Sequence, residues 1–160
     1  SVADIRSRCR RQQTRYGLDL VVIDYLGLLQ LGNKRGSLVA DIAEATRALK
    51  ILAKELQVPI MLLCQLSRGS ESRKENGYRP ILADLRDSGA IEQDADMVLL
   101  LYRKALAMRN RKDDSEYGGA PAEEIEDNTA EVIVAKNRNG PLKTVNLAFQ
   151  GMFSRFVNPS

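Results

Sequence analysis

The chain contains no histidine and no tryptophan, and it has only two cysteines among its 160 residues. Without histidine, the chain can supply neither imidazole metal ligands nor a histidine-dependent catalytic triad. Cys9 and Cys64 lack the spacing of metal ligands, which favours reduced thiols. No apolar run approaches the roughly 18 residues that a membrane-spanning helix needs, and the arginine-rich start does not resemble a signal peptide. We therefore expect a cytoplasmic location and no membrane partner.

Positive and negative charges are unevenly distributed, although the net charge is only +3. Residues 4–15 contain five arginines and one acid, residues 113–127 contain only acidic charges, and the chain after Val132 contains only basic ones. Segregation of this kind is typical of proteins that bind a polyanion. It is also typical of solvated surfaces, with residues 104–130 as a flexible acidic insert. Both interpretations stay open for each cluster taken alone.

Apolar patterning predicts an α/β protein whose single domain covers residues 1–160. The spacing of apolar residues predicts helices over residues 2–16 and 38–57. Short apolar runs predict three strands that are buried on both faces, at residues 18–24, 60–65 and 97–102. The first strand, the long helix and the second strand form a βαβ unit. Asn139-Gly140, between two further apolar segments, predicts an antiparallel hairpin.

Asp24 directly follows the first apolar run. In open α/β sheets, ligands lie beyond the carboxyl ends of the strands, and nucleotide triphosphatases place a carboxylate there, near the Mg²⁺ that bridges the phosphates. The alternative is an aspartate that only ends the strand in a turn. The phosphate-binding loop, G-x-x-x-x-G-K-[ST], is absent, because none of the eleven glycines is followed by lysine.

Gln65 follows the second apolar run, and Lys136 and Arg138 follow a later one. An amide both donates and accepts hydrogen bonds, so Gln65 could sense the γ-phosphate of a nucleotide, or it could bind a neighbouring loop. Lys136 and Arg138 are two residues apart, so on an extended strand their side chains point the same way. They could neutralise a transferring phosphoryl group across a subunit boundary. Alternatively, they keep the hairpin tip soluble.

Residues 84–89 combine an arginine with small residues and a glycine, ahead of the third predicted strand. Arg86 and the backbone N–H groups of such a loop could hold the phosphates of a single nucleic-acid strand without reading its bases. The alternative is a turn and a helix cap, with Asp87 or Ser88 as the capping residue.

Taken together, four segments resemble the DnaB family of bacterial replicative DNA helicases. They are Val21–Leu26, Gln65–Arg68, Asp84–Asp96 and Ala135–Pro141, and they occur in the order and spacing of that family. The resemblance runs over nearly the whole chain, but it covers only the later part of the family's C-terminal RecA-like motor domain. We expect the primase-binding domain, the linker, the phosphate loop and the catalytic glutamate of the family to precede Ser1.

The resemblance implies a RecA-like P-loop NTPase core fragment, with a mostly parallel sheet flanked by helices and a C-terminal antiparallel hairpin. It implies ATP and Mg²⁺ as cofactors, with Asp24 as the Walker B aspartate that holds Mg²⁺ and Gln65 as the γ-phosphate sensor. Lys136 and Arg138 match the pair that enters the neighbouring subunit's site, with Arg138 as the arginine finger.

The resemblance also implies an ATP-dependent DNA helicase that works as a ring of six identical subunits and unwinds duplex DNA at the replication fork. Arg86, Asp87 and Gly89 match the loop that lines the central pore and contacts single-stranded DNA. Primase and a helicase loader are the expected partners of the intact protein. Without the phosphate loop, we expect this chain alone to bind ATP weakly, to hydrolyse none and to expose apolar surface.

Gly27 departs from the family, which usually has glutamine there. Two other functions stay open: a RecA-like recombinase or clock-type ATPase of the same fold, and a non-catalytic module that binds nucleic acid or a partner. The segments 84–89 and 136–141 favour the helicase over the recombinase. The absent phosphate loop favours the binding module for this chain by itself.

Overall fold

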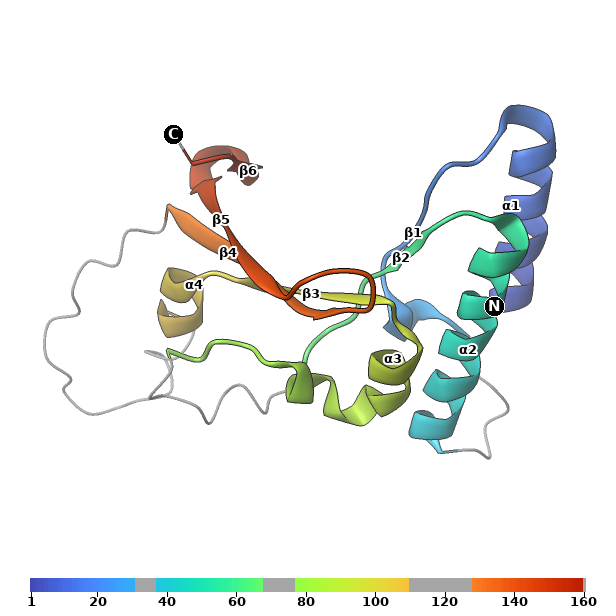
Figure 1. The fold of residues 1–160 in the computed structure, drawn as a ribbon, viewed down its shortest axis with the longest axis horizontal. Helices are drawn as coiled ribbons and strands as arrows, with labels where there is room; N and C mark the ends of the chain where they lie inside the picture. The colour runs from blue at the N-terminus through green and yellow to red at the C-terminus, as the bar shows by residue number, and fades with distance from the viewer. Residues whose placement is uncertain (31–36, 68–76, 110–127, 160) are drawn as a thin grey trace, which may run out of the picture. The chain divides into compact units, whose positions relative to one another are not determined.

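The computed structural model describes residues 1–30, 37–67, 77–109 and 128–159. Figure 1 shows the order of the elements, from helix α1 at the N-terminus to strand β6 near the C-terminus. Two compact units share these elements. The first unit contains residues 1–66 and 85–95, and the second contains residues 67–84 and 96–160.

Two long helices form where the apolar spacing predicts them. Helix α1 (Val2–Tyr16) begins where the Ser1 hydroxyl accepts a hydrogen bond from the Asp4 N–H at 3.3 Å, and it ends at Gly17, whose φ of 81° favours glycine. Helix α2 (Leu38–Leu56) ends at Gln57, and Pro59 keeps the preceding residue out of helical geometry. Both helix predictions are confirmed, within one residue at each end.

Strands β1 (Val21–Ile23) and β2 (Ile60–Leu62) pair in parallel, with Val21 opposite Ile60 and Ile23 opposite Leu62. Helix α2 connects them, so the predicted βαβ unit is confirmed. Both strands are shorter than predicted. Pro59 contributes its carbonyl to the Val21 N–H at 3.0 Å, but it has no N–H of its own to extend the ladder.

The core of the first unit lies between α1, α2 and this parallel pair. Leu52 of α2 is completely buried, with 0% of its surface exposed. It belongs to a cluster that also contains Cys9, Val21, Ile23, Leu49, Leu56 and Val58. A second, smaller cluster joins Leu26 of the short 3-10 helix η1 (Leu26–Leu28) to Ile42 and Ile91. The strand β1 therefore rests on α2 just before Asp24.

The second unit is built on an antiparallel sheet in the order β3-β4-β5-β6. Its strands are β3 (Met97–Tyr102), β4 (Thr129–Asn137), β5 (Lys143–Gln150) and β6 (Arg155–Val157), with the 3-10 helix η6 (Gly151–Phe153) before β6. The β4–β5 pair confirms the predicted C-terminal hairpin. Within the described residues, parallel pairing is limited to β1 and β2.

The prediction that the first three strands are buried on both faces is wrong for the described structure. Buried and exposed residues alternate along β1 and along β3. Successive side chains of a strand point to opposite faces, and only one face of each strand packs against other described residues. Apolar side chains on the other face stay exposed, including Val22 at 55%, Met61 at 50% and Leu101 at 55%. This matches the expectation that the chain exposes apolar surface.

Residues 84–89, expected to form a loop, are mostly helical. They belong to the 3-10 helix η4 (Leu82–Ser88) and to the start of helix α3 (Gly89–Asp94). Helix α4 (Lys104–Arg109) occupies the first six residues of the expected acidic insert, whereas residues 110–127 lie outside the described part. None of the described helices is long and apolar enough to cross a membrane.

Candidate nucleotide and nucleic-acid site

Asp24 lies at the carboxyl end of β1 and is exposed. Two backbone hydrogen bonds hold the chain on either side of it. The Leu63 N–H donates to the Ile23 carbonyl at 3.0 Å, and the Leu26 N–H donates to the Leu63 carbonyl at 2.9 Å. The backbone position of Asp24 is therefore fixed at the edge of the parallel pair, while its carboxylate remains accessible to a ligand.

Gln65 lies two residues beyond Leu63, past the same edge of the β1–β2 sheet, and it is also exposed. The neighbouring Cys64 is half-buried and packs against the cluster around Ile91. Burial raises the pKa of the Cys64 thiol, so the thiol stays protonated near pH 7 and is a poor metal ligand. The structure thus places one carboxylate and one amide at a common sheet edge, both open to solvent.

Gly27 lies close to the ring of Tyr25. A Cβ atom at position 27 would lie 2.5 Å from Cε2 of Tyr25, so a larger side chain there requires the ring to move. The departure from glutamine noted in the sequence therefore has a structural consequence. It lets the Tyr25 ring pack against the backbone that directly follows Asp24.

The donor set around Asp24 fits a metal ion that arrives with a nucleotide. In the described residues, no group of three or more His, Cys, Asp or Glu side chains could hold a metal ion. Mg²⁺ usually keeps several waters and takes only one or two protein carboxylates besides the substrate phosphates. A single exposed carboxylate meets that requirement, and Asp24 is the predicted ligand.

Arg138 lies in the turn directly after β4 and is exposed. Its N–H donates to the Asp96 carbonyl at 2.9 Å, and its Nη1 lies 3.7 Å from Oδ1 of Asp96. The two side chains are 50% and 55% exposed, so this ion pair orients the guanidinium only weakly. Asp96 has no predicted role from the sequence, because its contact with Arg138 depends on how β3 and β4 pair.

The pairing of β3 with β4 contains a bulge next to Lys136. Val98 pairs with Lys136, but Leu99 pairs with Val134, so Ala135 is the extra residue. Lys136 lies inside β4 and is half-buried, whereas Arg138 lies in the turn beyond the strand. Strand alternation therefore does not fix the relative direction of the two side chains, contrary to the expectation from their spacing.

The predicted DNA-contacting residues lie at the junction of η4 and α3. The backbone of Arg86 and Asp87 belongs to η4, and Gly89 is the first residue of α3. Asp84, only 2% exposed, accepts a hydrogen bond from the Ile81 N–H at 2.8 Å and stabilises the turn before them. The side chains of residues 86–88 lie outside the described part, and so does the predicted capping by Asp87 or Ser88.

The DnaB-like helicase C-terminal domain family matches residues 1–158. The chain belongs to this family. A replicative DNA helicase DnaB from Leifsonia xyli subsp. xyli is 48% identical over 158 residues, which cover 99% of this chain and 31% of that protein. A replicative DNA helicase DnaB from Geobacillus stearothermophilus is 44% identical, over 98% of this chain and 32% of that protein. The chain thus spans about a third of the length of these DnaB-like relatives.

Two solved structures of DnaB-like proteins have the same fold. One is an ATPase domain that is 40% identical, has a TM-score of 0.80 and covers 100% of this chain and 52% of that one. The other is a DnaB-like replicative helicase studied with primase; it is 40% identical, has a TM-score of 0.81 and covers 100% of this chain and 36% of that one. The predicted RecA-like α/β fold class is confirmed by this likeness.

Proposed function

We propose that the intact protein is an ATP-dependent replicative DNA helicase, which assembles as a hexamer, moves along single-stranded DNA and unwinds the duplex at the replication fork. The observation that carries the proposal is the exposed Asp24 at the carboxyl end of a parallel strand, with Gln65 past the same edge, in a chain of the DnaB-like family. The names of the relatives, replicative DNA helicases, support the same activity.

In this proposal, Asp24 binds Mg²⁺ that bridges the ATP phosphates, and the ion neutralises charge on the transferring phosphoryl group. The exposed amide of Gln65 lies past the same sheet edge, where it senses the γ-phosphate. The chain by itself has no phosphate-binding loop and therefore is not expected to hydrolyse ATP. The intact protein would supply that loop from its remaining length.

Lys136 and Arg138 act on the ATP site of a neighbouring subunit, with Arg138 as the arginine finger. The position of Arg138 in an exposed turn supports this role, because half of its side chain is accessible and its backbone is held by Asp96. An arginine supplied in this way stabilises the negative charge of the phosphoryl-transfer transition state. The role requires the hexamer, since each ATP site then lies between two subunits.

Arg86, Asp87 and Gly89 contact the backbone of single-stranded DNA in the pore of that ring. Primase is a proposed partner of the intact protein, because one of the solved DnaB-like helicases was studied for its interactions with primase. A helicase loader and a cytoplasmic location complete the proposal.

The function is tested with the full-length protein, by measuring ATP hydrolysis with and without oligothymidylate and strand separation on a forked duplex. Hydrolysis should rise with DNA, and the fork should be unwound. Arg86→Ala should weaken single-strand binding for every base composition and lower the slope of log affinity against log salt by about 0.7, because one phosphate contact is lost. A loss confined to particular sequences would contradict backbone contact, and a protein that hydrolyses no ATP would contradict the helicase.

Asp96→Asn should lower kcat for DNA-stimulated hydrolysis by about two- to fivefold, because an exposed ion pair orients Arg138 only weakly. Asparagine keeps the backbone carbonyl that binds the Arg138 N–H, so the strand pairing is preserved. The KM for ATP should not change. Asp19→Asn, which removes an exposed carboxylate from the other unit, is the matched control. An equal loss for both variants would mean that Asp96 does not act through Arg138.

A further inference from the structure

Helix α1 separates its five arginines into two groups. Arg6 and Arg10 face α2: Nε of Arg6 lies 3.6 Å from Oε2 of Glu55, and Arg10 binds the same carboxylate. Arg8, Arg11 and Arg15 are exposed, and within the described part of the chain none of them forms an ion pair or a side-chain hydrogen bond. Asp4 is the described acid that Arg8 influences most, and its carboxylate already accepts a hydrogen bond from the Ser1 hydroxyl at 2.7 Å.

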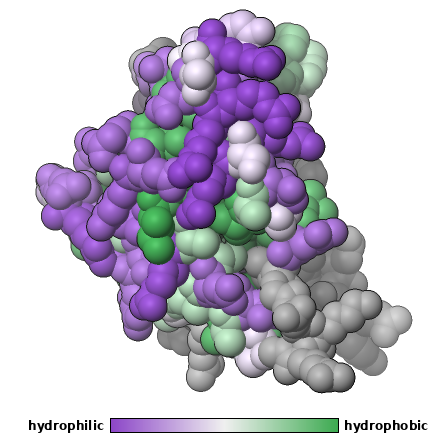
Figure 2. All heavy atoms as spheres, turned by 90° about the vertical axis from the view of Figure 1, so that its right-hand side faces the viewer, coloured by the Kyte–Doolittle hydropathy of each residue, from purple (hydrophilic) through white to green (hydrophobic). Residues whose placement is uncertain are grey.

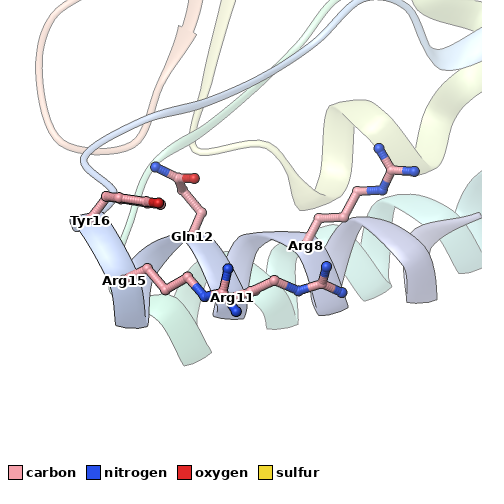
Figure 3. Close-up of a pocket in the computed structure, with 5 residues that line it drawn as sticks. All are labelled: Arg8, Arg11, Gln12, Arg15 and Tyr16. Atoms are coloured by element: carbon pink, nitrogen blue, oxygen red, sulfur yellow. The ribbon is translucent and has the colours of Figure 1, made fainter.

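The three exposed arginines lie on one side of α1. With about 100° of rotation per residue, positions 8, 11 and 15 fall within a sector of about 60°. Figure 3 shows their side chains extending from the same stretch of helix. Figure 2, in which the side of the molecule that carries α1 faces the viewer, shows a largely hydrophilic surface. We call Arg8, Arg11 and Arg15 the arginine face of α1.

The arginine face borders a shallow pocket of about 170 Å³, whose remaining lining residues are Gln12 and Tyr16. Tyr16 is 79% exposed, and Figure 3 shows its ring at the end of the helix beside Gln12. None of the residues assigned to the ATP site or to the pore loop lines this pocket. The proposed function above therefore leaves these five side chains without a role.

We propose that the arginine face is a second nucleic-acid site, which holds the phosphate backbone of a DNA strand outside the pore loop. Along the helix axis, Arg8 and Arg11 are about 4.5 Å apart, and Arg11 and Arg15 about 6 Å. These steps correspond to one or two nucleotides of a strand with a rise of about 3.4 Å. Guanidinium groups donate to phosphate oxygens in fixed geometry, and the exposed Tyr16 ring offers a platform for a base.

The chemistry of the pocket favours DNA over an acidic protein. Protein interfaces usually have an apolar core surrounded by polar residues, whereas the pocket is lined by three arginines, one glutamine and one tyrosine. Protein–DNA interfaces are more polar and more positively charged than protein–protein interfaces. The inference that this strand is DNA rests on the proposed function, but the site itself does not depend on the pore loop.

The test compares two variants of the full-length protein in equilibrium binding to labelled oligothymidylate at several salt concentrations, with a non-hydrolysable ATP analogue present. The first variant carries Arg8→Ala, Arg11→Ala and Arg15→Ala. Losing three phosphate contacts should lower the slope of log affinity against log salt by about 2, since each contributes about 0.7 on single strands. The affinity should fall by about tenfold or more at low salt.

The matched control carries Arg6→Ala and Arg10→Ala, which remove arginines of the same helix that Glu55 already neutralises. This control should change the slope by less than about 1. If the first variant acted by disrupting α1, the control would weaken binding at least as much, because it breaks contacts between α1 and α2. A third variant with lysine at positions 8, 11 and 15 should recover most of the slope, because it restores the charge.

Wild-type affinity and slope for the first variant would overturn the proposal and leave an acidic protein as the occupant. Equal losses in the control would also overturn it. DNA-stimulated ATP hydrolysis at saturating DNA should be unchanged in the first variant, since its residues do not touch the ATP site. Failure of this inference is therefore distinguishable from failure of the proposed function, which would appear as absent hydrolysis in the wild-type protein.

Discussion

Replacing Arg138 with alanine in the full-length protein is expected to abolish DNA-stimulated ATP hydrolysis while nucleotide binding largely survives. An arginine that stabilises the transition state from a neighbouring subunit contributes about 10³- to 10⁵-fold to kcat. Binding of the ground-state nucleotide depends on other groups, so the dissociation constant for ATP should change little. Steady-state hydrolysis and equilibrium binding of a fluorescent ATP analogue measure the two effects separately.

The structure makes this substitution a clean one. Arg138 is exposed in the turn after β4, and its contact with Asp96 through the backbone N–H is retained by alanine. Exposed substitutions of this kind usually change the free energy of unfolding by less than about 0.5 kcal/mol. Arg155→Ala removes another exposed arginine from the same sheet and is the matched control. It should leave hydrolysis unaltered.

Arg138→Lys distinguishes the guanidinium from its charge. Lysine carries a compact point charge and cannot bind a phosphoryl group through two parallel N–H groups. We therefore expect Arg138→Lys to recover only a small part of the lost rate. Near wild-type hydrolysis by Arg138→Ala would refute the role in the neighbouring site, and equal loss in Arg155→Ala would point to damage of the sheet instead.

The sequence was sufficient to predict the elements that carry the site. Helix α2 follows from apolar residues at helical spacing and from the stop at Pro59, and β3 follows from six consecutive residues, Met97 to Tyr102, of which five are aliphatic. The parallel β1–β2 pair follows from the strand-helix-strand order. Placing Asp24 and Gln65 at one edge then requires no further information, because the carboxyl ends of parallel strands meet at the same edge.

The sequence could not predict contacts that depend on register. The bulge at Ala135 shifts Lys136 against β3, and only the observed pairing brings Asp96 opposite Arg138. Burial of both faces was predicted for β3 because all of its residues are apolar, but the pattern cannot say which segment covers the second face. The separation of the α1 arginines was hidden because it depends on Glu55, which lies 45 residues from Arg10.

Leu52→Ala is expected to destabilise the first unit by about 2 to 5 kcal/mol, the range for truncating a fully buried leucine. Leu52 has 0% of its surface exposed and packs in the cluster that joins α1, α2 and β1. Alanine would remove the buried side-chain atoms and leave a cavity that the surrounding helices and strands fill only in part. The midpoint of chemical denaturation, followed by helical circular dichroism, measures the loss.

Ile51→Ala is the control that separates burial from helix composition. Ile51 precedes Leu52 on the same helix and is 52% exposed, so its truncation leaves no internal cavity. It should change the free energy of unfolding by less than about 1 kcal/mol. Because Val21 and Ile23 pack in the same cluster as Leu52, loosening it should also disturb the strand that positions Asp24. Equal destabilisation by the two variants would show that α2 does not bury Leu52 as the structure describes.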